Sequence, residues 1–193
     1  GVAPDMWIAK RRNGTYNWQV YTSALAPAGS NNFILTLNSN AAAEQITGTS
    51  FTSSSTFQPS SNAKRNSGDM IAYCFASKQG YSKFGKYVGN GSNSGPFIYT
   101  GFRPAFIMCK RSDSTGGWTI NDNKRLGYNP KNEDLFAHLA DAETSDERYD
   151  LFSNGFKVRT NNAVNNISGG TYIYMAFAEN PFTTSTGIPT TAR

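Results

Sequence analysis

The sequence predicts an all-β protein, an antiparallel β-sandwich, on the basis of three observations. Asn, Ser, Thr, Gly, Tyr and Phe are abundant while Leu, Lys and Glu are scarce, which is typical of short strands joined by turns. No window shows a sustained apolar period of about 3.6 residues, which a helix packed on a core would need. The chain also contains nearly the same pattern twice, so we expect its halves to form equivalent parts of one sandwich.

The repeat is most regular at the start of each half. Residues 1–11 match residues 101–111 without a gap, and Trp18 meets Trp118 at the same offset of one hundred. Because both halves share these features, we interpret them as scaffold and expect both tryptophans to be largely buried. A feature present in one half alone marks a place where a functional site could lie.

The same register returns near the end of each half. Residues 68–76 match residues 170–178, now at an offset of 102. We therefore predict internal repeats over approximately residues 1–80 and 101–182. With about five strands each, neither half is expected to close a good core alone, so the two should interlock as a single domain.

Each half is predicted to contain the same strands in the same order. The first strand ends in Lys-Arg before a polar turn. The second strand begins with the Trp that both halves contain. The last strand is almost continuously apolar, as expected of a strand that is buried on both faces. The predicted strands are 5–11 and 104–111, 18–21 and 118–121, 33–37 and 135–139, short segments around Phe51 and Phe57 matched by 151–152 and 155–158, and finally 70–76 and 171–178.

Two segments stand outside the repeat. Residues 84–100 are predicted to form a hairpin with a Gly-rich tip that joins the halves. Residues 183–193 are predicted to be a polar, loosely held C-terminal tail. Together these features predict a single domain over residues 1–193, with a jelly-roll or lectin-like topology.

Five motifs give the chain a resemblance to a known kind of domain. They are Trp7-Ile8-Ala9-Lys10-Arg11, residues 86–91 (KYVGNG), 100–104 (TGFRP), 172–178 (YIYMAFA) and 187–193 (GIPTTAR). With these motifs the whole chain resembles a duplicated, lectin-like β-sandwich domain of virion structural proteins of tailed phages, marine ones in particular. The resemblance implies a location at the end of a larger tail or appendage protein, and it implies no catalytic residues. The missing initiator Met fits a processed product or a piece of a longer polypeptide.

This resemblance implies a non-enzymatic virion surface protein, either a tail fibre or appendage module or a decoration protein on the capsid. Its expected work is subunit assembly and surface presentation, with other virion proteins and copies of itself as partners. Assembly would take place in the host cytoplasm, and no cofactor is expected. A carbohydrate-binding module that recognises a host surface glycan is the alternative, and a glycan hydrolase is a distant third.

Charge and residue counts narrow the function classes further. The net charge is +5, but the basic residues occur as scattered pairs rather than as a stripe, so nucleic acid is not an expected partner. No apolar run approaches the roughly eighteen residues of a membrane span. His138 is the only histidine, which argues against a two-His zinc site. Cys74 and Cys109 lie in apolar strands and are expected to be buried and unpaired.

An acidic stretch is the strongest feature that only the second half has. Seven of the 13 carboxylates lie between Glu133 and Asp150. The favoured interpretation is a solvated surface loop, with a weak calcium site as the alternative and catalysis the least favoured. The candidate calcium ligands are Asp141, Glu143, Asp146 and Glu147.

Two further sets of residues are candidate contact sites. Asn121, Asp122, Asn123 and Tyr128 could bind sugar hydroxyls, although turn formation is the favoured role of Asp122. Aromatic residues crowd around the predicted hairpin and are candidates for a subunit interface of more than about 1,000 Å², together with the C-terminal tail. These candidate interface residues are Tyr81, Phe84, Tyr87, Phe97 and Tyr99.

Overall fold

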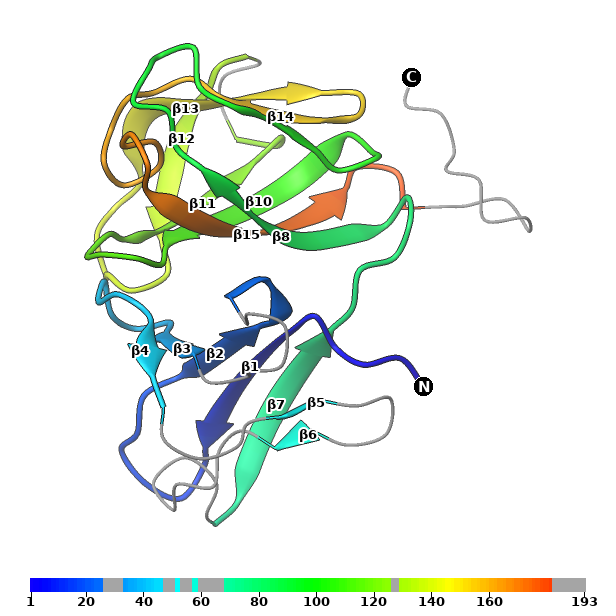
Figure 1. The fold of residues 1–193 in the computed structure, drawn as a ribbon, viewed down its shortest axis with the longest axis vertical. Coiled ribbons are helices and arrows are strands. Elements are labelled where there is room, and N and C mark those ends of the chain that lie inside the picture. The colour runs from blue at the N-terminus through cyan, green and yellow to red at the C-terminus, as the bar shows by residue number, and fades with distance from the viewer. Residues whose placement is uncertain (26–32, 47–50, 53–56, 59–67, 126–128, 182–193) are drawn as a thin grey trace.

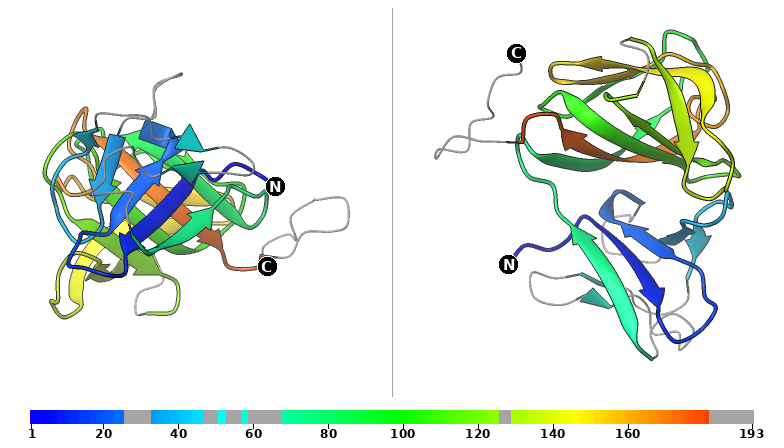
Figure 2. Two further views of the ribbon diagram at one scale, coloured as in Figure 1. Left: turned by 90° about the horizontal axis from the view of Figure 1, so that it is seen from below. Right: turned by 180° about the vertical axis from the view of Figure 1, so that it is seen from behind.

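Two antiparallel sheets packed face to face make up the fold (Figure 1). The computed structural model describes residues 1–25, 33–46, 51–52, 57–58, 68–125 and 129–181. Five strands form one sheet in the order β4-β3-β2-β1-β7, and eight form the other in the order β8-β15-β10-β11-β12-β13-β14-β9. The view from behind, on the right of Figure 2, shows the same two layers one above the other. The predicted all-β class and antiparallel β-sandwich are confirmed, while the jelly-roll or lectin-like topology stays a prediction.

The strands are short, as the composition predicts. The five-stranded sheet contains β1 (Met6–Arg11), β2 (Gln19–Thr22), β3 (Phe33–Thr36), β4 (Glu44–Gln45) and β7 (Met70–Phe75). The eight-stranded sheet contains β8 (Ser82–Val88), β9 (Phe97–Tyr99), β10 (Pro104–Arg111), β11 (Trp118–Asp122), β12 (Lys131–Phe136), β13 (Thr144–Phe152), β14 (Gly155–Val158) and β15 (Thr171–Ala178). A 3-10 turn, η1 (Ser23–Leu25), and a two-stranded ribbon of β5 (Phe51–Thr52) and β6 (Phe57–Gln58) complete the described elements.

Equivalent strands pair with equivalent register in the two sheets. Met6 lies opposite Thr22 and Phe75 in the first sheet. Phe106 lies opposite Asp122 and Phe177 in the second. The paired residues of the two sheets differ in number by 100 and 102, the same offsets that the sequence shows, and the internal repeats stay a prediction.

The main core lies between the sheets and takes equivalent side chains from both. Met6 and Val20 of the five-stranded sheet pack with Met108, Trp118 and Met175 of the eight-stranded sheet. Alternation along each strand directs every second side chain into this layer, which is why the hydrophobic pattern of the repeats has a period of two. The rings of Phe75 and Phe177, which are equivalent positions, meet edge to face with centroids 6.1 Å apart.

Each sheet also has a core on its outer face. The eight-stranded sheet curls around a cluster that includes Ile107, Cys109, Tyr149, Phe156 and Tyr172. The outer face of the five-stranded sheet buries a smaller apolar cluster of Trp7, Ala9, Tyr21, Ile34 and Ile46. The rings of Trp7 and Tyr21 stack in this cluster at 5.5 Å between centroids.

The predicted hairpin over residues 84–100 is wrong. β8 pairs with β15 and β9 pairs with β14, so these two strands form opposite ends of the eight-stranded sheet. The Gly-rich segment between them is bonded instead to the 166–170 loop, with the N–H of Gly89 donating to the carbonyl of Gly170 at 2.8 Å. A Cβ at Gly89 would lie 2.3 Å from the carbonyl oxygen of Ile167, so this crossing requires glycine. β8 and β9 therefore pair with strands distant in sequence, and not with each other as a hairpin would require.

The equivalent tryptophans are not equally buried. Trp118 is 1% exposed, and its Nε1–H donates to the Thr36 carbonyl at 2.9 Å across the two sheets. Trp18 is only partly buried, so the prediction for this residue was too strong. Trp118 donates to β3 of the opposite sheet, whereas Trp18 lies against the Lys10 ammonium and the Tyr73 ring.

Two strand predictions in the second half need correction. Much of the acidic stretch predicted as a loop is the nine-residue strand β13. The strand predicted over 135–139 is β12, which begins at Lys131 and ends at Phe136. These strands were not predicted in full because their sequences are rich in Asp and Glu and contain few apolar residues. In β13 the charged residues lie mainly in the exposed half of the strand.

Both cysteines are free, but only one is buried. Cys109 lies inside the curled sheet, where burial raises the pKa of its thiol to about 12. Cys74 is exposed, contrary to the prediction, because β7 is an edge strand of the five-stranded sheet. Within the described residues, the structure contains no helix of the length and apolarity that would cross a membrane.

Candidate functional site

The five candidate interface residues divide into two groups. Phe84 and Tyr87 are buried, one between the sheets and one inside the curled sheet, so their assignment to a contact surface was wrong. They were misassigned because the predicted hairpin would have left both rings outside the core. Tyr81, Phe97 and Tyr99 are exposed.

The candidate sugar-binding residues do not form an open cluster. Asn121 is buried, and its Nδ2 donates to the Glu133 carbonyl at 2.9 Å. Asp122 accepts from the backbone N–H groups of Lys124 and Arg125, which is the turn role that the sequence favours. The remaining candidates are Asn123, whose Nδ2 donates to Glu179 Oε1 at 2.8 Å, and Tyr128, which lies outside the described residues.

The candidate calcium ligands do not converge. Glu143 accepts from Arg125 at 2.6 Å, and Asp146 accepts from Arg148 at 2.7 Å. Over the described ranges, no group of three or more His, Cys, Asp or Glu side chains is placed to hold a metal ion. Asp141 and Glu147 are exposed and belong to no such group, so the calcium site is corrected to a set of separate surface carboxylates.

A buried polar network inside the curled sheet was not predicted as a unit. Arg148 forms an ion pair with Asp134, and its Nη1 donates to Asn165 Oδ1 at 2.7 Å. The amide of Asn165 in turn donates to Thr119 Oγ1 at 3.0 Å and to the Tyr149 hydroxyl. The signal was available in the repeat, because Asp134 stands where the first half has the core residue Ile34.

The network is a structural element rather than an open site. Asp134 and Asn165 are fully buried, and Arg148 is almost so. Burial raises the pKa of Asp134, and the facing Arg148 opposes that shift. With no exposed face, this cluster specifies the interior of the curled sheet and is not placed to meet a ligand.

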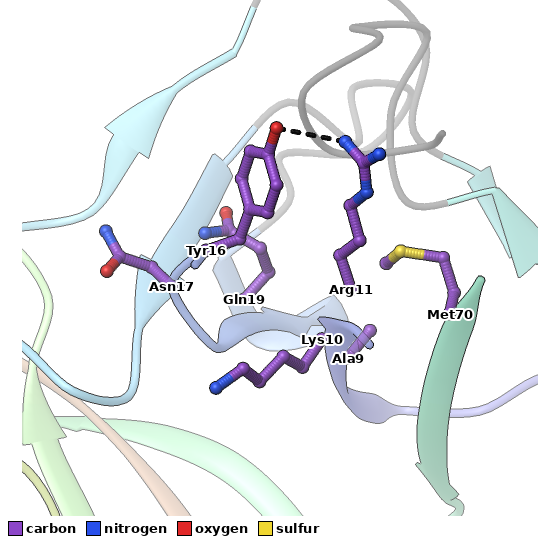
Figure 3. A pocket seen from close by; sticks show the side chains of 7 residues that line it. All are labelled: Ala9, Lys10, Arg11, Tyr16, Asn17, Gln19 and Met70. Atoms are coloured by element: carbon purple, nitrogen blue, oxygen red, sulfur yellow. Dashed lines mark hydrogen bonds between the residues drawn. The ribbon is translucent and has the colours of Figure 1, made fainter. Parts of the chain in front are cut away.

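A small pocket of about 160 Å³ lies at the end of the five-stranded sheet (Figure 3). The guanidinium of Arg11 donates through Nη1 to the Tyr16 hydroxyl at 2.9 Å and through Nε to Asn13 Oδ1 at 2.6 Å. It also lies over the Tyr16 ring, 4.8 Å from the centroid. The remaining lining residues are Ala9, Lys10, Asn17, Gln19 and Met70.

The pocket contains one unsatisfied polar atom. The side-chain oxygen Oε1 of Gln19 is buried and has no hydrogen-bond partner in the described structure. A buried acceptor without a donor costs about 1–3 kcal/mol. Because this oxygen has almost no accessible surface, it belongs to the packed wall of the pocket and is not a contact point for a ligand. Figure 3 shows the Lys10 amine pointing away from the Arg11 guanidinium.

An aromatic surface extends next to this pocket on the other face of the sheet. The rings of Trp18 and Tyr73 stack with centroids 6.4 Å apart, and the ammonium of Lys10 lies 5.3 Å from the Trp18 centroid. Tyr73 and Ile71, two residues apart on β7, are both exposed. We call Lys10, Trp18, Ile71 and Tyr73 the tryptophan surface.

A second aromatic surface lies at the free edge of the eight-stranded sheet. Phe97 and Tyr99 project from the same face of β9, and Phe97 contacts Phe152 at 5.9 Å between ring centroids. Their exposed fractions are 47%, 62% and 40% for Phe97, Tyr99 and Phe152. We call these three residues the β9 surface.

The β9 surface borders a groove of about 470 Å³. Tyr99, Thr100 and Gly101 line one side. The other side is lined by the beginning of β8 and the turn before it, with Ser77, Lys78, Gln79, Ser82 and Lys83. The groove therefore separates the two edge strands of the curled sheet, which are the strands that a hairpin would have paired.

Comparison with known proteins places the chain in a family. A family described as "domain of unknown function (DUF7483)" matches residues 1–181, nearly the whole chain, and the chain belongs to this family. No curated protein matches the chain, and no solved structure does so.

Proposed function

We propose that this member of the DUF7483 family is a non-enzymatic surface module of a phage virion, which assembles with neighbouring subunits through the β9 surface. It would act in a tail appendage or on the capsid, bind other virion proteins and copies of itself, and be assembled in the host cytoplasm. The resemblance of its sequence motifs to virion β-sandwich domains supports this role.

The exposed aromatic cluster is the observation that carries the proposal. Aromatic rings are enriched in the buried centres of protein interfaces, and an exposed cluster of them marks a contact surface. Phe97 and Tyr99 lie on the edge strand β9, and Phe152 at the end of β13 contacts Phe97. Unpaired backbone groups of an edge strand can also bind a neighbouring chain. The interface we expect here buries more than about 1,000 Å².

Replacing Phe97 and Tyr99 together with serine is expected to weaken self-association at least tenfold. The change removes roughly 100 Å² or more of apolar contact, which contributes about 2.5 kcal/mol at 25 cal/mol per Å². Sedimentation velocity over a concentration series measures the effect. Leu139→Ser is the matched control, because Leu139 is an exposed apolar side chain outside this surface. A wild-type chain that stays monomeric and fails to bind virion particles would argue against the proposal.

Glycan binding is the second candidate function, and the tryptophan surface favours it. A partly exposed Trp and an exposed Tyr side by side provide apolar ring surface, with the ammonium of Lys10 beside it. Carbohydrate ligands combine such an apolar face with hydroxyl groups that need hydrogen-bond partners. The second half has Met175 in place of Tyr73, so this surface belongs to the first half alone.

Tyr73→Ala is expected to lower the affinity for a bound glycan about tenfold. Loss of roughly 60 Å² of ring contact accounts for about 1.5 kcal/mol. A glycan array identifies the ligand and titration calorimetry measures the change, with Tyr99→Ala as the control at an exposed tyrosine of the other surface. Equal losses in both variants would show that the tryptophan surface has no particular role.

A further inference from the structure

We infer that the pocket around Arg11 binds the carboxylate of an acidic sugar residue, such as a uronic acid. The inference rests on the glycan-binding candidate above and adds the class of sugar and the group that recognises it. Two features carry it: an arginine without a described carboxylate partner in the wall of a pocket, and a carboxylate that pairs the equivalent arginine of the second half.

The charge of Arg11 is not neutralised within the described structure. Its hydrogen bonds go to the neutral groups of Asn13 and Tyr16, and no ion pair joins Arg11 or Lys10 to a described carboxylate. A guanidinium has five N–H donors in a planar fork, so donors on the Nη atoms remain available. This arrangement suits a carboxylate, which accepts two parallel hydrogen bonds from such a fork.

In the second half the equivalent arginine is paired with a carboxylate. Arg111, the equivalent of Arg11, donates through Nε to Asp113 at 2.9 Å. The first half has Asn13 where the second has Asp113, so a single carboxylate distinguishes a paired arginine from an unpaired one. The Asn side chain keeps the hydrogen bond that orients Arg11 and leaves its charge for a ligand.

The walls of the pocket are also specific to the first half. Tyr16 and Asn17 are replaced by Gly116 and Gly117 in the second. A Cβ at Gly117 would lie 2.6 Å from the His138 ring, so no side chain fits at that position. The pocket is therefore not a by-product of the repeated scaffold.

The size and polarity of the pocket select the ligand. A volume of about 160 Å³ equals the space of roughly five water molecules, enough for one sugar ring or its acidic end. The carboxylate would bind the Nη donors of Arg11 that Tyr16 leaves available. The apolar side chain of Met70 lies beside Arg11 and offers contact to the C–H groups of the ring (Figure 3).

Binding of an oligogalacturonate to the full chain tests the inference, with a neutral galacto-oligosaccharide of equal length as the comparison. We expect the acidic oligosaccharide to bind at least tenfold more tightly, and less tightly as salt is raised. Arg11→Gln and Asn13→Asp should each remove that preference, the second by pairing Arg11 as Asp113 pairs Arg111. Arg111→Gln is the matched control and should leave binding unchanged.

Each outcome separates this inference from the function on which it rests. Equal binding of acidic and neutral sugars, or unchanged binding in Asn13→Asp, would overturn the acidic-sugar site and leave the glycan-binding candidate in place. Binding of neither sugar, nor of any other glycan on an array, would overturn both. Thermal melting of each variant shows whether a loss of binding is caused by unfolding. If Arg11→Gln does not fold, Asn13→Asp still tests the inference, because Asn13 is exposed.

Discussion

Trp118→Ala is expected to destabilise the protein by about 3–5 kcal/mol, the usual cost of truncating a large buried aromatic residue. The indole is almost fully buried between the sheets, and its Nε1–H donates to Thr36 of the opposite sheet. Removal would open a cavity in the main core and leave the Thr36 carbonyl without this donor. Chemical denaturation followed by fluorescence or circular dichroism measures the loss.

Trp18→Ala is the matched comparison for this prediction. The equivalent tryptophan is partly exposed and is covered by a lysine and a tyrosine side chain, so its removal should cost about 1 kcal/mol. Equal destabilisation by the two changes would mean that the two tryptophans are equally buried, which would contradict the structure.

Arg148→Met is expected to destabilise the protein by about 3–5 kcal/mol at neutral pH, because it leaves Asp134 buried without its partner. The loss should be smaller at about pH 4. Burial already raises the pKa of Asp134, and without Arg148 that pKa would rise further. A carboxyl group whose folded pKa lies above its unfolded value destabilises the fold as pH rises and stops doing so once it is protonated.

A double variant, Arg148→Met with Asp134→Ile, is expected to recover most of that stability. Ile34 shows that an apolar residue is accepted at the equivalent position of the first half, and buried ion pairs are often replaceable by apolar side chains together. Denaturation curves of the two single variants and the double variant give the coupling energy. Additive losses would contradict the interpretation that the pair acts as a unit.

Much of the fold could be predicted because the repeat gives each strand twice. The apolar strands 70–75 and 171–178 and the Trp-led strands β2 and β11 lie close to their predicted positions, since a period of two with a buried face is a local property. The acidic strand β13 was not predicted. Its charged residues lie on the exposed part of the strand, and such a charged sequence is also typical of a loop.

The candidate sites were harder to predict than the strands. The hairpin was inferred from local turn signals, but the partners of β8 and β9 are β15 and β14, which are distant in sequence. That error placed Phe84 and Tyr87 on a surface although both are buried. The Arg11 pocket depends on Asn13 and Tyr16, which accept hydrogen bonds from Arg11 without neutralising its charge, and such partners are not visible in a sequence.

The strand order also sets the timing of folding. β1 is flanked by β2, which follows it at once, and by β7, which comes much later in the chain; β10 has the same relation to β11 and β15. Each sheet is therefore completed by contacts of large sequence separation, which is the property that slows the folding of small β proteins. During synthesis, β1 leaves the ribosome with one edge open and keeps it open until residues 70–75 arrive. Strand edges left open in this way are sites of aggregation, so production of this chain should depend on slow synthesis or on chaperones more than that of a helical protein of equal length.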